Sequence, residues 1–502
     1  MQNTKDTNGV LTKRKGIKML RAISDAVWGM PTVLLIVLAG LYFSLKTGFV
    51  QLRAMPEALR FARRELRGGT SAYRAIASSL AATVGTGSIT GVATALTLGG
   101  AGAVFWLWVS AFFGMAVSYA EGVLSIKYSI PDGKGKKGGI MYALSLGLKK
   151  PAAAWIYAAL TVAASFGMGS MAQVNSASSA LESELSVPTW ATAAVIAVFA
   201  GACLFSGKDL GAKFCSVFLP LISVGYVAAS VWLICSNIDA LPSAFEQIFC
   251  GAFGIRQFAG GTAGYAVKTA LSTGFKRGVF SNEAGLGTTA AIHAESGCKT
   301  AREQGLMNML EVVIDTFVIC TLTALGILSS GAAGSGLDGA ELVIAAFKTC
   351  FYDSSGIVVA VIIASFAAAT VIGWSKIGSA AFDYLVSGCR MNAHNAKYGN
   401  AKYGNAKYGN AEQGNTEHDK SRPKKTLAEH AMCAVYPLMF CTACFLGGVT
   451  RLDTAWQLSD IFNGLMVLPC MLALIGLRKE IIFADHVPAR RKRPSRSKVY
   501  RL

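Results

Sequence analysis

A stretch of uncharged residues from Ser78 to Gly100 holds three glycines in its middle, Gly85, Gly87 and Gly91, among threonine and serine. A helix broken at these glycines exposes carbonyl groups at the end of its first half and N–H groups at the start of its second half. The two ends carry about half an elementary charge of opposite sign. A zwitterionic amino acid needs both, and a sodium ion also accepts carbonyl ligands. The alternative interpretation is close helix packing through small residues such as Gly87 and Gly91.

A second stretch, "GFKRGVFSNEAGLGTTAA" at 274–291, places Lys276, Arg277, Asn282 and Glu283 inside a segment that otherwise has the composition of a membrane span. A charge at membrane depth costs at least about 2.5 kcal/mol and usually lines a cavity or pairs with another charge. The alternative is an ordinary loop beside the membrane. The flanking glycines favour a second broken helix, and two such helices in corresponding positions are typical of transporters.

The elements that position these residues are predicted to be membrane-spanning helices. The chain has 502 residues, is 53% hydrophobic and only 15% charged, and has a mean hydropathy of +0.46. A soluble domain carries about 25% charged residues. We predict eleven spans: 27–48, 76–98, 101–125, 152–178, 190–206, 214–236, 265–292, 306–330, 357–387, 429–448 and 457–477.

The distribution of basic residues excludes nucleic acid as the reason for the net charge of +19. The loops 46–75, 126–150, 389–430 and 478–502 hold seven, six, eight and nine Lys or Arg residues, whereas 179–189, 237–264, 329–356 and 449–456 hold three in total. This alternation follows the positive-inside rule and places the C-terminus in the cytoplasm of a cell-membrane protein. Eleven spans then put the N-terminus outside, although residues 1–26 carry six basic residues.

The order of the spans predicts two halves. The first broken span opens a group of five spans at 76–236 and the second opens another five at 265–477, and an odd number of spans per half makes the repeats inverted. The helix 27–48 stands outside this pairing, and 1–26 and 478–502 are tails. The loop 391–428 contains the low-complexity repeat "AKYGNAKYGNAKYGN" and is predicted to be a cytoplasmic linker.

Acidic residues inside predicted spans are further candidates. Asp315 lies in the middle of a span and is a functional-site candidate by default. Asp315 can pair with a bound cation, with Lys276 or with Arg277, and the sequence does not distinguish between these partners. Glu121 lies nearer to a span end, from which it can reach the interface. We find no nucleophile–base set, metal-ligand spacing or phosphate-binding loop, so an enzyme is not expected, and no repeated filter loop indicates an ion channel.

Several segments resemble the alanine or glycine:cation symporter family, also called the sodium:alanine symporters. They are "AATVGTGSITGVATALTLGG", "FWLWVSAFFGMAVSYAEGVLSIKY", "GSMAQVNS", "GFKRGVFSNEAGLG", "EVVIDTFVICTLTALGIL", "ATVIGWSKIGSAAFDYL" and "WQLSDIFNGLMVLPCMLALIGL", in the family's order. The resemblance covers about residues 27–390 and 430–478. It implies an all-α polytopic membrane protein with the leucine-transporter-like fold: two inverted five-helix repeats and one extra N-terminal helix.

The resemblance also implies site residues. The substrate carboxylate is expected at the backbone of Thr86 and Gly87, with Gln173 beside the substrate and Trp374 closing a small apolar pocket. Thr370, one helical turn before Trp374, is expected to help bind cation and substrate. Without the resemblance, the Gln173 side chain is equally suited to a hydrogen bond with a neighbouring helix, and the Thr370 hydroxyl to a hydrogen bond with the backbone of its own helix.

The second break is expected to offer carbonyl groups to the substrate's ammonium group. The resemblance places this unwound stretch at Gly278, Phe280, Ser281 and Asn282.

A sodium site is expected to draw on the backbone around Ala81 and Val84, on Ser88 and on Thr370. The family motif usually reads Gly-Thr-Gly-Asn, but Ser88 replaces the asparagine here, and Ala369 provides no hydroxyl where the family usually has serine or threonine. Both changes remove oxygen ligands, so proton coupling stays open beside sodium coupling.

The sequence therefore predicts a symporter that imports a small neutral amino acid, alanine or glycine, by alternating access around a midplane site. Its partners are the amino acid, the coupling sodium ion and the lipid bilayer. No organic cofactor and no nucleic acid are expected, and the sequence does not give the oligomeric state.

Overall fold

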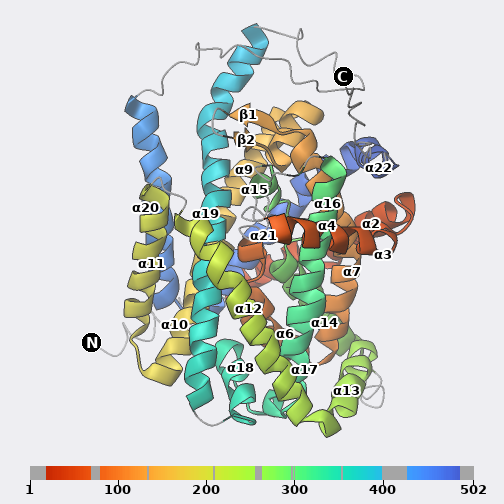
Figure 1. Ribbon diagram of the computed structural model, residues 1–502, viewed down its shortest axis with the longest axis vertical. Coiled ribbons are helices and arrows are strands. Elements are labelled where there is room, and N and C mark those ends of the chain that lie inside the picture. Colours follow the sequence, from red (N-terminus) through yellow and green to blue (C-terminus); the bar gives the residue numbers. More distant parts are fainter. Residues whose placement is uncertain are drawn as a thin grey trace, which may run out of the picture.

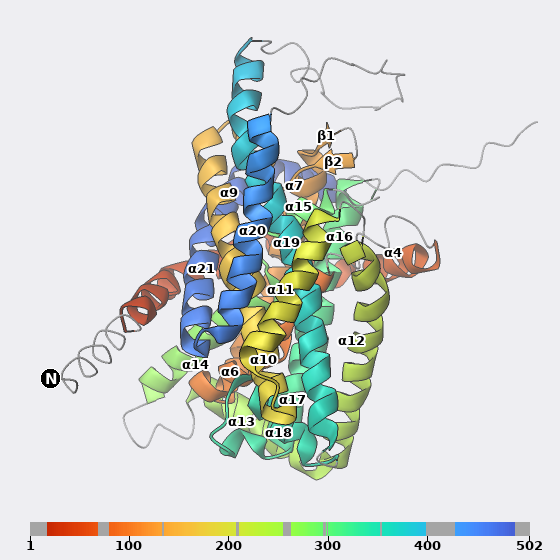
Figure 2. The same cartoon turned by 90° about the vertical axis from the view of Figure 1, so that its left-hand side faces the viewer.

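The computed structural model describes residues 18–68, 80–132, 135–206, 210–254, 263–294, 298, 300–351, 354–397 and 427–486. Within them the chain forms a bundle of helices that run mostly along its long axis (Figure 1 and Figure 2). The first elements are the helix Lys18–Lys46, which includes α2 (Met30–Lys46), the short helices α3 (Val50–Arg53) and α4 (Met55–Gly68), a helical stretch at 80–83, a 3-10 turn at Thr86–Ser88, α6 (Thr90–Gly99) and α7 (Gly102–Lys127).

The middle of the chain continues the bundle. It comprises β1 (Ile130–Asp132), β2 (Gly135–Lys137), α8 (Ile140–Tyr142), a π-helical turn at Ala143–Gly147, α9 (Pro151–Phe166), a π-helical turn at Gly167–Met171, α10 (Ala172–Leu185), α11 (Thr189–Phe205), α12 (Leu210–Ser236), a 3-10 turn at Ile238–Ala240 and α13 (Leu241–Phe253).

The last part contains the second broken helix and the long helices around it. Its elements are α14 (Ala263–Asn282), α15 (Ala290–His293), α16 (Ala301–Val312), a π-helical stretch at Val313–Cys320, α17 (Thr321–Ser329), a 3-10 turn at Ala332–Gly334, α18 (Gly339–Lys348), α19 (Ser354–Lys397), α20 (Leu427–Val449), α21 (Leu452–Gly476) and α22 (Arg478–His486).

The helices account for the predicted spans. Seven described helices are long and apolar enough to cross a membrane, and two shorter apolar helices are Thr189–Phe205 and Ala434–Val449. The two broken helices, at 80–99 and 263–293, supply the remaining spans. The bounds of the two repeats, 76–236 and 265–477, stay a prediction.

Three helices extend past predicted boundaries, which were approximate and stay predictions. The first helix begins at Lys18, well inside the predicted tail, and α19 continues to Lys397, inside the predicted linker 391–428. The start of the C-terminal tail is helical as α22. In each case the helix continues past the end of the apolar pattern, because helical hydrogen bonds do not require apolar side chains. The repeat at 398–426 lies outside the described residues.

The two classes of loop lie at opposite ends of the bundle. The β1–β2 hairpin, in which Ile130 pairs with Lys137, belongs to a basic loop and lies at the top of Figure 1 with α22. The elements α13 and α18 belong to loops poor in basic residues and lie at the bottom. This arrangement agrees with the alternation of basic and non-basic loops along the sequence.

The burial of the spans separates inner from outer helices. In α7, 67% of the apolar window is buried, against 28% in α12. The large apolar side chains of Val217, Leu221 and Val224 on α12 are exposed. An apolar outer surface of this kind suits contact with lipid chains.

The first helix break follows directly from glycine. After the helical stretch at 80–83, Gly85 is extended, with φ −136° and ψ −157°, and the chain then passes through the 3-10 turn into α6. A Cβ atom at Gly85 would lie 3.1 Å from Cβ of Thr370 and 3.2 Å from Oε1 of Gln173. The glycine therefore permits two side chains from other helices to approach the broken backbone.

The second helix break lies later than the sequence predicts. Gly278 to Asn282 form the last turns of α14, so the expected unwinding there was wrong. The chain breaks at 283–289, where Glu283, Gly285 and Gly287 have positive φ values of 57°, 93° and 70°. The left-handed residue that directly follows the end of α14 is Glu283, and Gly285 and Gly287 add two further left-handed positions to the break.

Side chains from neighbouring helices satisfy the backbone of this second break. The Gly285 N–H donates to Glu121 Oε1 at 2.9 Å, and the Tyr157 hydroxyl donates to the Leu286 carbonyl at 2.8 Å. Glu121 is 1% exposed, so the expectation that it reaches the interface was wrong. Irregular backbone is tolerated at membrane depth only where such partners are supplied.

Candidate substrate and cation site

The first break and α10 form the centre of the candidate site. The backbone N–H and the hydroxyl of Thr86 both donate to Gln173 Oε1, at 3.2 and 2.6 Å, and Gln173 Nε2 donates to the Met168 carbonyl at 3.1 Å. These residues are buried. Thr86 precedes the N-terminus of α6, where the helix dipole favours negative charge. A substrate carboxylate at this N–H group would take the place of the glutamine oxygen.

Helix α19 brings Thr370 against the same break. Its hydroxyl faces Gly85, is buried, and has no hydrogen-bond partner within the described residues. A Cβ atom at Gly373 would lie 2.7 Å from Cα of Ala82, so α19 packs directly on the stretch that contains Ala81 and Val84. The helix that carries the expected hydroxyl of a cation site thus packs against the stretch that contains the expected backbone ligands. A buried hydroxyl without a partner costs about 1–3 kcal/mol, which a ligand would recover.

The end of α14 covers the first break from a different direction. Two ring carbons of Phe280 would lie 3.1 and 3.3 Å from a Cβ atom at Gly87. Gly278 instead faces Ser110 on α7, so it serves helix packing rather than the break. Phe280 therefore limits the room above Gly87 to a small group.

Ser281 and Asn282 point to the π-helical stretch, and the Ser281 hydroxyl also donates to the Ser88 hydroxyl of the first break at 3.1 Å. The Ser281 hydroxyl lies 2.6 Å from Asp315 Oδ2, and Asn282 Nδ2 donates to Thr316 Oγ1 at 3.1 Å. The Ser88 hydroxyl donates to Asp315 Oδ1. Asp315 hence joins both broken helices. Lys276 and Arg277 pair with Asp460 and not with Asp315, so the pairing of Asp315 with either cation, which the sequence left open, is not formed.

Trp374 lies one turn beyond Thr370 and is fully buried. Its indole N–H donates to Glu283 Oε1 at 2.8 Å, and the Thr288 hydroxyl donates to Glu283 Oε2. A Cβ atom at Gly169 would lie 2.6 Å from Cγ of Trp374, so the indole fills the space beside the π-helical turn between α9 and α10. The tryptophan therefore connects the second break to the helix that carries Gln173.

The buried cations pair with a residue that the sequence analysis missed. Lys276 Nζ and Arg277 NH2 approach Asp460 Oδ2 at 2.8 and 3.0 Å, and the Arg277 guanidinium lies 4.3 Å from the ring centroid of Trp456. The Trp456 ring lies 4.5 Å from that of Phe280. Asp460 is an acid within the predicted span 457–477, so the rule that singled out Asp315 would also have found it.

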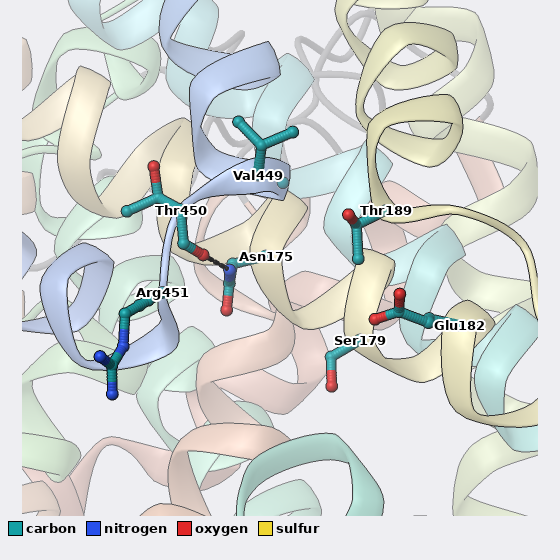
Figure 3. Close-up of a pocket in the computed structure, with 8 residues that line it drawn as sticks. Asn175, Ser179, Glu182, Thr189, Val449, Thr450 and Arg451 are labelled. Carbon is teal, nitrogen blue, oxygen red and sulfur yellow. Dashed lines mark hydrogen bonds between the residues drawn. The ribbon is translucent and has the colours of Figure 1, made fainter. Parts of the chain in front are cut away.

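A cavity of about 290 Å³ lies on another face of α10 (Figure 3). It is lined by Asn175, Ser179, Glu182, Thr189, Gly448, Val449, Thr450 and Arg451. Asn175 Nδ2 donates to the Thr450 carbonyl at 2.7 Å and to the Gly447 carbonyl at 3.0 Å. Because Asn175 is two residues after Gln173, its side chain points roughly opposite to it on the helix. The cavity contains none of the predicted site residues.

Comparison with known proteins gives the family. A model of the sodium:alanine symporter family matches residues 14–397 and 422–497. The chain belongs to the sodium:alanine symporter family. The sodium/alanine symporter AgcS of Methanococcus maripaludis is 33% identical over 93% of this chain and 96% of its own, and the probable sodium/glutamine symporter GlnT of Bacillus subtilis is 30% identical over 95% and 91%.

The fold has a solved counterpart. The crystal structure of MhsT in complex with L-phenylalanine has a TM-score of 0.51 at 13% identity, covering 82% of this chain and 96% of MhsT. Such a likeness shows the fold alone. As a sodium:alanine symporter family member, the protein is a multi-pass membrane transporter and not an enzyme, so the predicted family, fold class and functional class are confirmed.

Replacing Gln173 with leucine tests whether the Thr86 N–H receives the substrate. Leucine keeps the volume but leaves a buried donor without an acceptor, which should lower the free energy of unfolding by about 1–3 kcal/mol. Added L-alanine should then raise the melting temperature more than in the unmodified protein, because its carboxylate satisfies the orphaned N–H. Thermal unfolding with and without L-alanine measures both effects.

Ser170→Ala is the matched control, since the Ser170 hydroxyl donates to the Phe166 carbonyl of its own helical segment at 2.7 Å. A smaller alanine-induced shift in the Gln173 variant would show that the glutamine itself holds the substrate.

Proposed function

We propose that the protein imports a small neutral amino acid, with L-alanine or glycine as the substrate, together with sodium. The observation that carries this proposal is the arrangement at the first break. The N–H of Thr86 follows Gly85 in the chain, and the hydroxyl of Thr370, which has no hydrogen-bond partner within the described residues, faces Gly85. The N–H suits a carboxylate, and the hydroxyl with the carbonyl end of the helix at Ala81 and Val84 suits a cation.

The size of the substrate follows from the side chains around the glycines. Phe280 lies over Gly87, and Trp374 fills the space beside Gly169. We infer that these bulky side chains leave room for an amino acid with a methyl group or no side chain. The relatives AgcS and GlnT are described as sodium symporters of alanine and glutamine, which supports the class of substrate and of coupling ion.

The proposed orientation places the basic loops and the C-terminus in the cytoplasm of the cell membrane. The hairpin and α22 lie at that end, opposite α13 and α18 (Figure 1). Alternating access then moves the helices around the two breaks so that the site opens to one end at a time.

Proton coupling is the second candidate. Glu283 and Asp315 are 2% and 0% exposed, and the groups that donate hydrogen bonds to them are the neutral side chains of Trp374, Thr288, Ser88, Ser281 and Thr316. A buried carboxylate held by neutral donors favours either a bound metal cation or a proton.

Uptake by proteoliposomes separates the two candidates. Radiolabelled L-alanine is offered to the purified protein under an imposed sodium gradient, a proton gradient or neither. We expect accumulation with the sodium gradient and none in protein-free vesicles. Accumulation with the proton gradient alone would overturn sodium as the coupling ion. A lack of uptake for both L-alanine and glycine under every gradient, with glutamine accumulated instead, would overturn the proposed substrate.

A further inference from the structure

The short helices α3 and α4 follow directly after the first membrane-spanning helix, which ends at Lys46. Figure 2 shows α4 lying across the long axis of the bundle and projecting from its side. It lies at the same end of the bundle as α22, because Arg302 bonds both to Glu57 of α4 and to Asp485 of α22, at 2.7 and 2.6 Å. A helix in this position runs along the boundary between lipid and water.

One face of α4 packs against the start of α16. Phe61 forms a small apolar cluster with Met307 and Leu310. The carboxylate of Glu57 accepts from Arg302 NH2 at 2.7 Å and from Arg302 Nε at 3.3 Å. Glu57, the acid of α4 whose side chain the structure describes, is therefore neutralised on the side of the helix that faces the protein.

The outer face of α4 combines apolar and cationic side chains, and we define it by Leu59, Arg60 and Arg63. All three are exposed, and the first two lie four and three residues before Arg63, so they share one side of the helix. The Arg60 guanidinium donates to the Pro56 carbonyl of its own turn at 3.2 Å. Within the described residues, neither arginine forms an ion pair. This face therefore presents two uncompensated positive charges beside an exposed leucine.

Exposed leucines of the first helix lead to this outer face. Leu38, Leu41 and Leu45 are exposed at spacings of three and four residues, which places them on one side of a helix that is long and apolar enough to cross a membrane. Such a stripe contacts lipid chains. Leu52 of α3 and Leu59 of α4 are also exposed and continue the series beyond the end of the span. The lipid-facing surface thus extends to α4.

We propose that the outer face of α4 docks on the anionic headgroups of the lipid leaflet that borders it. The guanidinium groups of Arg60 and Arg63 bind phosphate oxygens, for which the planar set of arginine donors is well suited. The apolar stems of the two arginines and Leu59 rest on the boundary of the acyl chains. A zwitterionic lipid also carries a phosphate, but its ammonium group cancels the negative charge of the surface. The two arginines therefore select an anionic membrane.

This docking acts on the transporter through Arg302. The residue lies in the first turn of α16 and holds both Glu57 of α4 and Asp485 of α22. Helix α16 continues into the π-helical stretch that carries Asp315. A membrane that fixes α4 therefore also fixes the start of α16 relative to the bilayer surface.

Hydrogen exchange at the backbone amides of α4 tests the docking in the full-length protein, in nanodiscs of phosphatidylglycerol or of phosphatidylcholine. Docking stabilises the helix against local opening, so exchange should be slower in phosphatidylglycerol. Each basic residue near an anionic surface contributes about fivefold in affinity, so two arginines should slow exchange by roughly 25-fold. Most of this difference should be lost in Arg60→Gln/Arg63→Gln. Because both side chains are exposed, the variant should fold, and its melting temperature in phosphatidylcholine checks this.

Lys268→Gln/Arg451→Gln is the matched control. It removes two exposed basic residues, one in the first turns of α14 and one directly after α20, both away from α4. This variant should keep the full difference between the two lipids. About 1 M choline chloride should abolish the difference in the unmodified protein, because the Debye length then falls to about 3 Å.

Two results would overturn the docking surface: equal exchange of α4 in the two lipids, or a difference that persists unchanged in Arg60→Gln/Arg63→Gln. Soluble glycerol phosphate added to phosphatidylcholine nanodiscs distinguishes a membrane from a free phosphate compound. We expect no change of exchange on its addition. Protection of α4 by glycerol phosphate would assign the two arginines to a small soluble ligand and would contradict docking on lipid.

Discussion

Replacing Asp460 with asparagine is expected to lower the free energy of unfolding by about 3–5 kcal/mol, because removal of one partner from a buried ion pair leaves uncompensated charge. The carboxylate serves both Lys276 and Arg277, and the side chains of Arg277 and Asp460 are only 3% and 1% exposed. Total stabilities of single domains are about 5–15 kcal/mol, so this is a large share. We expect a much lower melting temperature and a poor yield of monodisperse protein.

A surface ion pair supplies the control for this variant. Lys137 and Asp383 approach to 3.3 Å with side chains 35% and 30% exposed, and such pairs contribute about 0–1 kcal/mol. Asp383→Asn should therefore melt close to the unmodified protein. Adding Lys276→Met to Asp460→Asn should recover part of the loss, since one buried charge is then gone. If Asp460→Asn had the same melting temperature as the unmodified protein, water would already be solvating the charges of Lys276 and Arg277, and the prediction would be wrong.

Gly85→Ala is expected to impair transport more strongly than a glycine-to-alanine substitution at any other position of the first break. The new Cβ atom would meet the Thr370 hydroxyl, and would lie 3.1 Å from Cβ of Thr370 and 3.2 Å from Oε1 of Gln173. Overpacking of this kind costs about 1–3 kcal/mol. Because it falls on the groups proposed to hold cation and substrate, the KM for L-alanine should rise roughly 10- to 100-fold.

Gly91→Ala is the matched control in the same segment. Its Cβ atom would meet the Trp456 ring at 3.4 Å, which is ordinary contact, and alanine favours the helix by about 1 kcal/mol over glycine. Uptake kinetics and thermal unfolding of both variants separate a site effect from a folding effect. An unchanged KM in Gly85→Ala would remove the first break from the proposed site.

The membrane architecture was predictable because it depends on composition. Apolar length and the alternation of basic loops are properties of consecutive residues, so the predicted spans fall on the helices. The first break was also predictable, since Gly85 and Gly87 weaken the helix in a span whose length and lack of charge otherwise favour a continuous one. The second break was misplaced because two patterns compete there. Gly278 is used for packing on α7, whereas the positive φ values of the break belong to Glu283, Gly285 and Gly287, after the end of α14.

The partners of the buried charges were not predictable. Arg277 is separated from Asp460 by 183 positions, and Asp315 is separated from Ser88 by 227. Sequence spacing says nothing about which helices meet across such distances. The residue types did limit the choice, because an acid in a span requires a partner, and both Asp315 and Asp460 found one on α14.

The first helix bonds to both sides of the ion cluster formed by Lys276, Arg277 and Asp460. The Ser24 hydroxyl accepts from Lys276 on α14 at 2.6 Å, and the Trp28 indole donates to the Asp460 carbonyl on α21 at 2.7 Å. Any movement that separates α14 from α21 must therefore break at least one of these bonds. A helix predicted to lie outside both repeats thus adds to the activation barrier for separating α14 from α21.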